Sequence, residues 1–127
     1  MRTERQRRGS AAELDAANHL EQLGWLLIAR NVRVGRDEID VLAVDPGPPK
    51  NLVAVEVRSL RSSAFGAPEE RVDRRKVGHM YRGLAAVCTS DAVATEHRRL
   101  ARRVDLLIVD RRTGATQVRH LRSLEPP

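Results

Sequence analysis

Acidic residues interrupt two apolar, β-branched segments of this chain of 127 residues. The first segment contains Glu38-Ile39-Asp40 and the second contains Val55-Glu56-Val57-Arg58. Alternation along a strand predicts that Glu38 and Asp40 share one face of a sheet with Leu42. By the same rule Glu56 and Arg58 share a face of the next strand. Because an unpaired charge among apolar residues is expensive, these carboxylates are candidates for a chemical role.

The predicted pairing of the two strands brings two of the acids together. We expect the proline-rich loop at residues 46–49 to join an antiparallel pair in which Asp45 lies opposite Asn51. This register places Asp40 opposite Glu56. Directly opposed side chains have Cβ atoms about 4.5–5.5 Å apart, and like charges at that distance repel. A divalent cation removes the repulsion, and carboxylate oxygens suit Mg²⁺ or Mn²⁺, so Asp40 and Glu56 are predicted to hold one such ion.

Each of these acids also has a purely structural interpretation. Glu38 follows the turn residues Gly35-Arg36-Asp37 and could end a strand in solvent. Asp40 could form a buried salt bridge with an arginine. Glu56 could pair in the same way with Arg58 or Arg33. The two opposed acids are more specific than either acid alone, because one structural interpretation must explain both.

A fourth acid, Glu13, belongs to a predicted helix. The sequence Ser10-Ala11-Ala12-Glu13 has the form of a capping box and predicts a helix from Ser10 to Leu23, ended by Gly24. Glu13 also lies on the core side of this helix, whose apolar stripe consists of Ala16, Ala17, Leu20 and Leu23. From the residues alone, capping is the simpler explanation of Glu13.

The other elements predict a mixed α/β domain. Strands are expected at residues 25–34, 38–45 and 51–58, and their short connections imply an antiparallel meander. A helix is expected over residues 69–87, acidic at its start, followed by a short polar stretch over 90–100 that could also be helical. That crossover allows a strand at 104–109 to pair in parallel, and residues 117–121 are expected at an edge. Residues 1–9 are predicted to form a flexible basic arm and residues 10–127 a single domain.

Charge and composition limit the classes of molecule that the protein is expected to bind. The net charge of +6 and the isoelectric point near 10.8 favour a polyanionic partner, above all nucleic acid. No apolar run approaches the length of a membrane span, and no signal segment follows the basic N-terminus, so no membrane partner is expected. Cys88 is the only cysteine, which excludes an intramolecular disulfide and indicates a cytoplasmic protein. The scattered histidines and the lack of a phosphate-cradling glycine loop argue against zinc, ATP and dinucleotides.

The residues described above belong to a longer pattern that resembles the YraN-like family of uncharacterised bacterial proteins. The pattern covers nearly the whole chain, and its most specific part runs from Asn31 to Glu56. Its members here are Gly9, Glu13, Ala16, Leu20, Gly24-Trp25, Ile28, Asn31, Glu38-Ile39-Asp40, Val55-Glu56-Val57, Phe65-Gly66, Pro68, Val72, Lys76 and Arg103-Val104-Asp105. The family is similar to the restriction-endonuclease-like nucleases, including Holliday-junction resolvases. The resemblance implies their αβββαβ core, a mixed central sheet flanked by helices.

The resemblance also implies a catalytic site. In those nucleases the site consists of an Asp on one strand, Glu-x-Lys on the next and often a Glu from the first helix. Asp40 matches the Asp, Glu56 matches the Glu of the second strand, and Glu13 matches the helical Glu. By this resemblance Glu13 becomes a member of the site as well as a capping residue.

One position departs from the nuclease pattern, because Arg58 stands where those enzymes have the lysine. Arginine stays protonated in proteins and cannot act as a base, whereas a lysine can help to activate water. Arg58 can still bind the scissile phosphate and stabilise developing charge. The departure therefore puts catalysis in question and leaves phosphate binding intact.

The leading interpretation is a phosphodiester hydrolase that uses Mg²⁺ or Mn²⁺ and acts on nucleic acid. DNA, which could be branched, is the expected substrate, and the protein could act as a homodimer. Catalytic roles are expected for Glu13, Asp40, Glu56 and Arg58, whereas Arg33, Arg36, Arg61 and Lys76 are expected to contact nucleic acid. The sequence alone does not place Lys76 at the acids. Two alternatives remain open: a binding module for structured nucleic acid that has lost catalysis, and a protein-interaction subunit whose basic charge is incidental.

Overall fold

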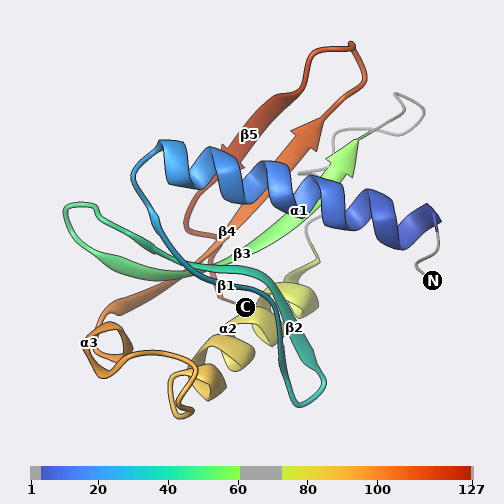
Figure 1. The fold of residues 1–127 in the computed structure, drawn as a ribbon. Coiled ribbons are helices and arrows are strands. Elements are labelled where there is room, and N and C mark those ends of the chain that lie inside the picture. Colours follow the sequence, from blue (N-terminus) through green and yellow to red (C-terminus); the bar gives the residue numbers. More distant parts are fainter. Residues whose placement is uncertain (1–3, 61–72, 127) are drawn as a thin grey trace.

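Two helices cover the opposite faces of one central sheet (Figure 1). The computed structural model describes residues 4–60 and 73–126, with side chains from Ala11 onward within those ranges. Arg61, which was predicted to contact nucleic acid, lies outside the described residues. Within the described part of the chain, no helix combines the length and apolar character needed to cross a bilayer.

The sheet is five-stranded and mixed, in the order β1-β2-β3-β4-β5. The strands are β1 (Leu26–Val34), β2 (Asp37–Asp45), β3 (Asn51–Leu60), β4 (Ala101–Asp110) and β5 (Gln117–Leu121). Strands β3 and β4 pair in parallel, and the other neighbours pair antiparallel. The predicted meander, the parallel return and the edge strand at residues 117–121 are therefore confirmed, as short connections and a helical crossover require.

Helix α1 (Glu4–Gln22) begins earlier than predicted. Residues 4–8 read Glu-Arg-Gln-Arg-Arg, which are good helix formers, and the helix continues through Gly9 and Ser10. Part of the predicted N-terminal arm is thus helical. Because Ser10 lies inside α1, the capping-box interpretation of Glu13 is wrong. The predicted end is confirmed, since Gly24 follows the helix with φ of +86°, a conformation that suits glycine.

Helix α2 (Arg74–Val87) begins later than predicted and ends where predicted. Asp73 caps it by accepting a hydrogen bond from the Arg75 backbone N–H at 2.9 Å. The acids expected at the helix start, Glu69 and Glu70, lie outside the described residues, and the observed first turn contains no acid. A four-residue helix, α3 (Thr95–Arg98), precedes β4, so only part of the stretch 90–100 is helical.

The core has one layer on each face of the sheet. The layer under α1 contains Ala12, Ala16, Leu20, Trp25, Val41, Ala43, Val53, Val55, Leu107 and Val109. The layer under α2 includes Ile39, Leu42, Val44, Leu52, Ala54, Val77, Met80, Leu84 and Val87. Leu23, predicted to lie on the apolar stripe of α1, is 47% exposed because it lies beyond the last turn of the helix, whereas Ala12 is buried. Cys88 is buried as a small apolar residue, as expected.

The side-chain alternation of β2 shifts by one residue near Asp40. Ile39 packs in the α2 layer together with Leu42, whereas Val41 packs in the α1 layer. Strict alternation would put Ile39 and Val41 on one face. The expectation that Asp40 shares a face with Leu42 is therefore wrong. The shift coincides with two irregularities: the β2–β3 pairing ends at Val41, and Asn31 of the neighbouring strand has φ of +55°.

Candidate active site

The predicted register of β2 and β3 is confirmed. Asp45 pairs with Asn51, and the antiparallel ladder continues to the pair Val41 and Val55. Asp40 and Glu56 are the next residues of the two strands, at the point where the ladder ends. The proline-rich turn thus fixes the place of both acids, because the register of an antiparallel pair follows from the residues nearest its turn.

Asp40 takes up the space between the two strands where their pairing stops. Its Oδ2 accepts a hydrogen bond from the Val57 backbone N–H at 2.9 Å. A strand N–H that points toward a neighbouring strand lies in the plane of the sheet, so the Asp40 carboxylate lies at the level of the sheet between β2 and β3. Burial raises the pKa of Asp40, a rise that the Val57 hydrogen bond opposes.

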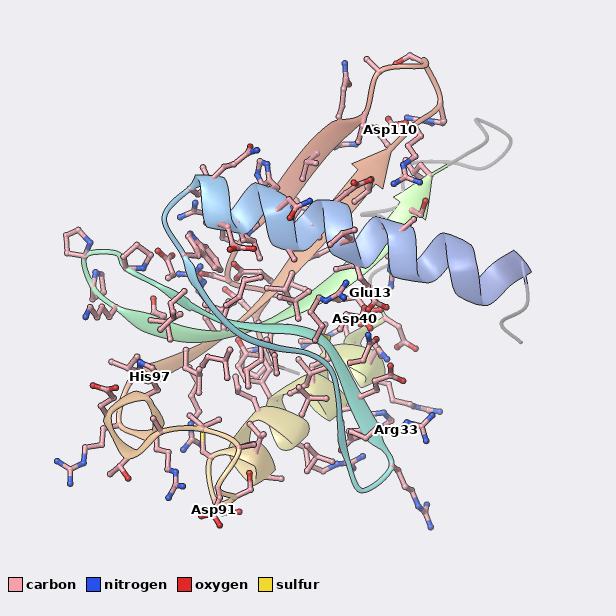
Figure 2. The ribbon with its side chains drawn as sticks, in the orientation of Figure 1. Glu13, Arg33, Asp40, Asp91, His97 and Asp110 are labelled. Atoms are coloured by element: carbon pink, nitrogen blue, oxygen red, sulfur yellow. The ribbon has the colours of Figure 1, made fainter. Side chains whose placement is uncertain are left out.

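Glu13 reaches the same place from α1. Figure 2 shows Glu13 of the helix next to Asp40 of β2. Burial raises the pKa of Glu13, and the negative charge of Asp40 raises it further. A side-chain hydrogen bond with Asn31 opposes this rise, yet the Oε2 atom of Glu13 is buried without a hydrogen-bond partner. A buried carboxylate oxygen without a partner is costly, so the fold keeps Glu13 at some expense in stability.

Glu56 approaches from the other face of the sheet. Its neighbours Val55 and Val57 pack toward α1, so alternation turns Glu56 toward α2. There its Oε2 lies 3.7 Å from the Lys76 Nζ atom. Burial raises the pKa of Glu56, and the charge of Asp40 raises it further. Glu56 and Asp40 are therefore electrostatic neighbours, as predicted, and Lys76 forms an ion pair with Glu56.

Arg58 also lies near the acids, because its positive charge lowers the pKa of Glu56 against the dominant effect of burial. The side chain is partly buried on β3. Arginine and lysine thus both face Glu56, one from the same strand and one from α2. As a residue type, arginine stays protonated in proteins and acts only as a cation.

The predicted nucleic-acid contacts divide into two groups. Arg33 is exposed on β1 and lies toward the turn of the β1–β2 hairpin, farther out than Asp40 (Figure 2). Arg36 lies in that turn and lines a hollow of about 190 Å³ together with Lys76 and His79 of α2. Glu38, which is exposed as its strand-end interpretation required, lines the same hollow. Arg36 and Lys76 thus line one hollow, whereas Arg33 extends the basic surface outward.

The acids have raised pKa values but do not form a complete metal site. Within the part of the chain that the structure describes, no three Asp, Glu, His or Cys side chains already have the arrangement of metal ligands. Glu13, Asp40 and Glu56 instead converge from three elements, with Lys76 against one of them. Their charge and chemistry suit a hard divalent cation.

A second buried acid shows how this fold treats a structural carboxylate. Asp105 is fully buried and accepts two hydrogen bonds from Arg103 at 2.9 Å each. His120 and the Ser123 backbone N–H supply further bonds at 2.8 and 2.9 Å. Although burial raises the pKa of Asp105, these partners outweigh it and hold the pKa below its ordinary value. Glu13, Asp40 and Glu56 lack such compensation, which sets them apart from a structural ion pair.

The sequence did not place two residues, Asn31 and Lys76, beside these acids. Asn31 contacts Glu13 and has a positive φ. The only hint of this conformation in the sequence is the residue type, because asparagine tolerates a positive φ better than most residues do. Lys76 contacts Glu56, but no spacing rule links β3 to a helix twenty residues later. Both positions belong to the pattern of residues that carried the family resemblance.

Comparison with known proteins agrees with that resemblance. Residues 12–109 match the family described as "Uncharacterised protein family UPF0102". A UPF0102 protein of Arthrobacter sp. (strain FB24) is 35% identical over 117 residues, which is 91% of this chain and 93% of the relative. Another from Pseudarthrobacter chlorophenolicus is 38% identical over 110 residues, covering 86% of this chain and 78% of the relative. A third, from Deinococcus radiodurans, is 39% identical over 83 residues, covering 65% and 66%.

Proposed function

The chain belongs to the uncharacterised protein family UPF0102, and we propose that it is a metal-dependent phosphodiester hydrolase that acts on nucleic acid. The observation that carries the proposal is the convergence of Glu13, Asp40 and Glu56, all with raised pKa values, where the β2–β3 ladder ends. Three poorly compensated carboxylates at one point of a fold are characteristic of a functional site.

The fold supports the same proposal. Apart from the four-residue α3 before β4, the order α1, β1, β2, β3, α2, β4, with β3 and β4 parallel, is the order expected for a restriction-endonuclease-like core. Asp40 and Glu56 then occupy the positions of the two strand acids of those nucleases, and Glu13 occupies that of the helical acid. We include this fold assignment in the proposal.

The donor set fits Mg²⁺ or Mn²⁺. Asp40 and Glu56 would hold the ion, and Glu13 would complete the acidic set through its buried Oε2, which has no partner of its own. A divalent ion held there supplies positive charge next to the phosphoryl oxygens of a substrate. The same ion would also relieve the repulsion that contributes to the raised pKa values of Glu13 and Glu56.

The protein's own side chains have separate tasks in the proposed reaction. Arg58, which stays protonated, binds the scissile phosphate and stabilises the charge that develops on it. Glu13 accepts a proton from the attacking water, because a carboxylate with a raised pKa is a better base than an exposed one. Asp40 is held in place by the Val57 N–H, so its position does not depend on the substrate.

The substrate is proposed to be DNA, bound through its phosphates. The net charge of +6 favours a polyanion. Arg33 and Arg36 lie exposed on the hairpin that leads away from the acids, where they could follow the backbone. A cytoplasmic location, and a two-fold dimer for branched DNA, are part of the same proposal. Size-exclusion chromatography coupled to light scattering tests the dimer.

Cleavage of labelled branched and linear DNA tests the proposal directly. The purified full chain is incubated with Mg²⁺, with Mn²⁺ or with EDTA, and the products are resolved on denaturing gels. We expect cleavage only with a divalent ion, and a loss of about 100-fold or more in Asp40→Ala, since metal ligands are central to such catalysis. Asp91→Ala is the matched control, because Asp91 is exposed and distant from the site (Figure 2). Equal cleavage by the wild type and Asp40→Ala would reject the assigned role.

A binding module without catalysis is the second candidate, and Arg58 is the observation that favours it. Arg58 stands beside Glu56 where a lysine is expected, and arginine does not lose its proton. Arg58→Lys separates the two candidates. If the wild type binds DNA without cutting it and Arg58→Lys gains cleavage, the chain is a nuclease fold that has lost its activity. If the wild type already cuts, the hydrolase stands.

A further inference from the structure

Lys76 forms an ion pair with Glu56, one of the three acids of the site. Its Nζ atom lies 3.7 Å from the Glu56 Oε2 atom, and its side chain is 43% exposed, against 17% for Glu56. The positive charge of Lys76 also lowers the pKa of Asp40, against the rise that burial causes. Lys76 therefore partly neutralises the two acids that are proposed to hold the metal ion.

This ion pair is easily broken. A separation of 3.7 Å is longer than a direct hydrogen bond, and a partly exposed pair contributes little stability. Lysine carries a compact charge at the end of a flexible chain, so the ammonium group can move several ångströms without any change in the backbone. A doubly charged ion between Asp40 and Glu56 would repel the ammonium group, because like charges at such distances repel strongly in a partly buried site.

A destination for the displaced ammonium group is a hollow that Lys76 also lines. The hollow of about 190 Å³ is lined by Lys76 itself, by Arg36 and by His79. Two acids also line the hollow: Asp37, which Arg82 holds through two hydrogen bonds of 2.9 and 2.8 Å, and Glu38, which is exposed to solvent. The hollow is smaller than the roughly 300–1,000 Å³ of pockets for drug-sized ligands, so it suits a phosphate group rather than a whole nucleotide.

We propose that Lys76 is the internal counter-ion of the acid cluster, which a divalent cation displaces from Glu56 so that its ammonium group binds a substrate phosphate in the adjoining hollow. The inference rests on the proposed function and goes beyond it, because it couples two binding events. The cation releases Lys76 for the phosphate, and the phosphate holds Lys76 away from the cation site. Each ligand therefore strengthens the binding of the other. Lys76 acts as a positioning residue for the phosphate.

Binding measurements on the full chain test the coupling without relying on cleavage. Mn²⁺ affinity is measured by calorimetry for the wild type, Lys76→Met and Arg75→Met. Arg75 is the matched control, since it is an exposed cation in the same turn of α2. We expect Lys76→Met to bind Mn²⁺ about three- to tenfold more tightly, as expected for removal of a competing, partly exposed ion pair, and Arg75→Met to remain within about twofold of wild type.

The second measurement is the affinity for a DNA duplex in Ca²⁺ and in EDTA, at equal ionic strength. We expect Ca²⁺ to strengthen binding to the wild type and Arg75→Met, and this gain to fall at least about threefold in Lys76→Met, because the coupling is reciprocal. An unchanged gain in Lys76→Met, or equal Mn²⁺ affinities in all three proteins, would overturn the inference. If the wild type binds no Mn²⁺, or if Asp40→Ala binds it equally well, the proposed function fails too. If Mn²⁺ binding depends on Asp40 but not on Lys76, only the counter-ion role fails.

Discussion

Replacing Glu13 by glutamine should stabilise the protein at neutral pH. The Glu13 Oε2 atom is buried without a partner, and Asp40 and Glu38 add negative charge nearby. Glutamine has nearly the same shape, keeps an oxygen for the contact with Asn31 and removes the charge. The glutamine amide is still a buried polar group, but an unsatisfied charged group costs more than the about 1–3 kcal/mol of a neutral one, so we expect the free energy of unfolding at pH 7.5 to rise by about 1–2 kcal/mol.

The gain in stability from Glu13→Gln should disappear at acidic pH. Burial and the charge of Asp40 raise the pKa of Glu13 in the folded protein above the ordinary value of about 4.3 for an exposed Glu. The folded state therefore binds this proton more tightly than the unfolded state does. Its contribution to stability is fully present below pH 4.3 and is lost as the pH rises through the folded-state pKa. Glutamine, which mimics the protonated acid, should thus match wild type near pH 4 and exceed it at pH 7.5.

Urea unfolding followed by circular dichroism, at pH 4 and at pH 7.5 in EDTA, measures both effects. Glu21→Gln is the matched control on α1, because Glu21 is exposed, and it should leave stability unchanged at both pH values. Addition of Mn²⁺ at pH 7.5 should stabilise the wild type and narrow its difference from Glu13→Gln, since a ligand that binds only the folded state adds stability. A Glu13→Gln variant that is less stable than wild type at pH 7.5 would refute the reasoning, as would a gain of equal size at pH 4.

Two further predictions concern the rest of the molecule. Asp105→Ala should lower the free energy of unfolding by about 3–5 kcal/mol, because it leaves the Arg103 guanidinium without two of its buried hydrogen bonds. Urea unfolding checks this, with the exposed Asp91→Ala as a control expected to match wild type, and a loss below about 1 kcal/mol would contradict it. Arg33→Ala and Arg36→Ala should each weaken DNA binding, and by the same factor whatever the DNA sequence, because both side chains are expected to contact phosphates. Each substitution should also reduce the magnitude of the slope of log affinity against log salt concentration by about one. Fluorescence anisotropy at several salt concentrations measures that slope, and a sequence-dependent loss would argue against contacts with phosphate alone.

The arrangement of strands was predictable because it depends on short connections and local patterns. The proline-rich turn fixed the pairing of Asp45 with Asn51, and the crossover through α2 required a parallel β4. The helix starts were less predictable. Ser10 has the form of a cap, but the helix formers before it extend α1 to Glu4. Local signals of this kind compete, and the sequence alone does not show which one prevails.

The site was predictable only where it follows from the register. Asp40 and Glu56 were placed together by counting along two paired strands. The shift of alternation at Asp40 was not predicted, because it depends on how Ile39 packs against α2 rather than on the pattern within β2. The Lys76 contact was not predicted either, since it depends on the angle at which α2 crosses the sheet. Tertiary packing, which periodicity does not encode, decides such details.

The end of the β2–β3 ladder explains how acids from both faces of the sheet can act together. Glu13 comes from α1 on one face and Glu56 is turned toward α2 on the other. A fully paired sheet would separate them, because its backbone bonds leave no room for a side chain between adjacent strands. Here the Asp40 carboxylate takes the Val57 N–H where the pairing has stopped. It therefore lies between the strands and is the electrostatic neighbour of both glutamates. The local loss of sheet pairing is thus what makes a site of three carboxylates possible in this fold.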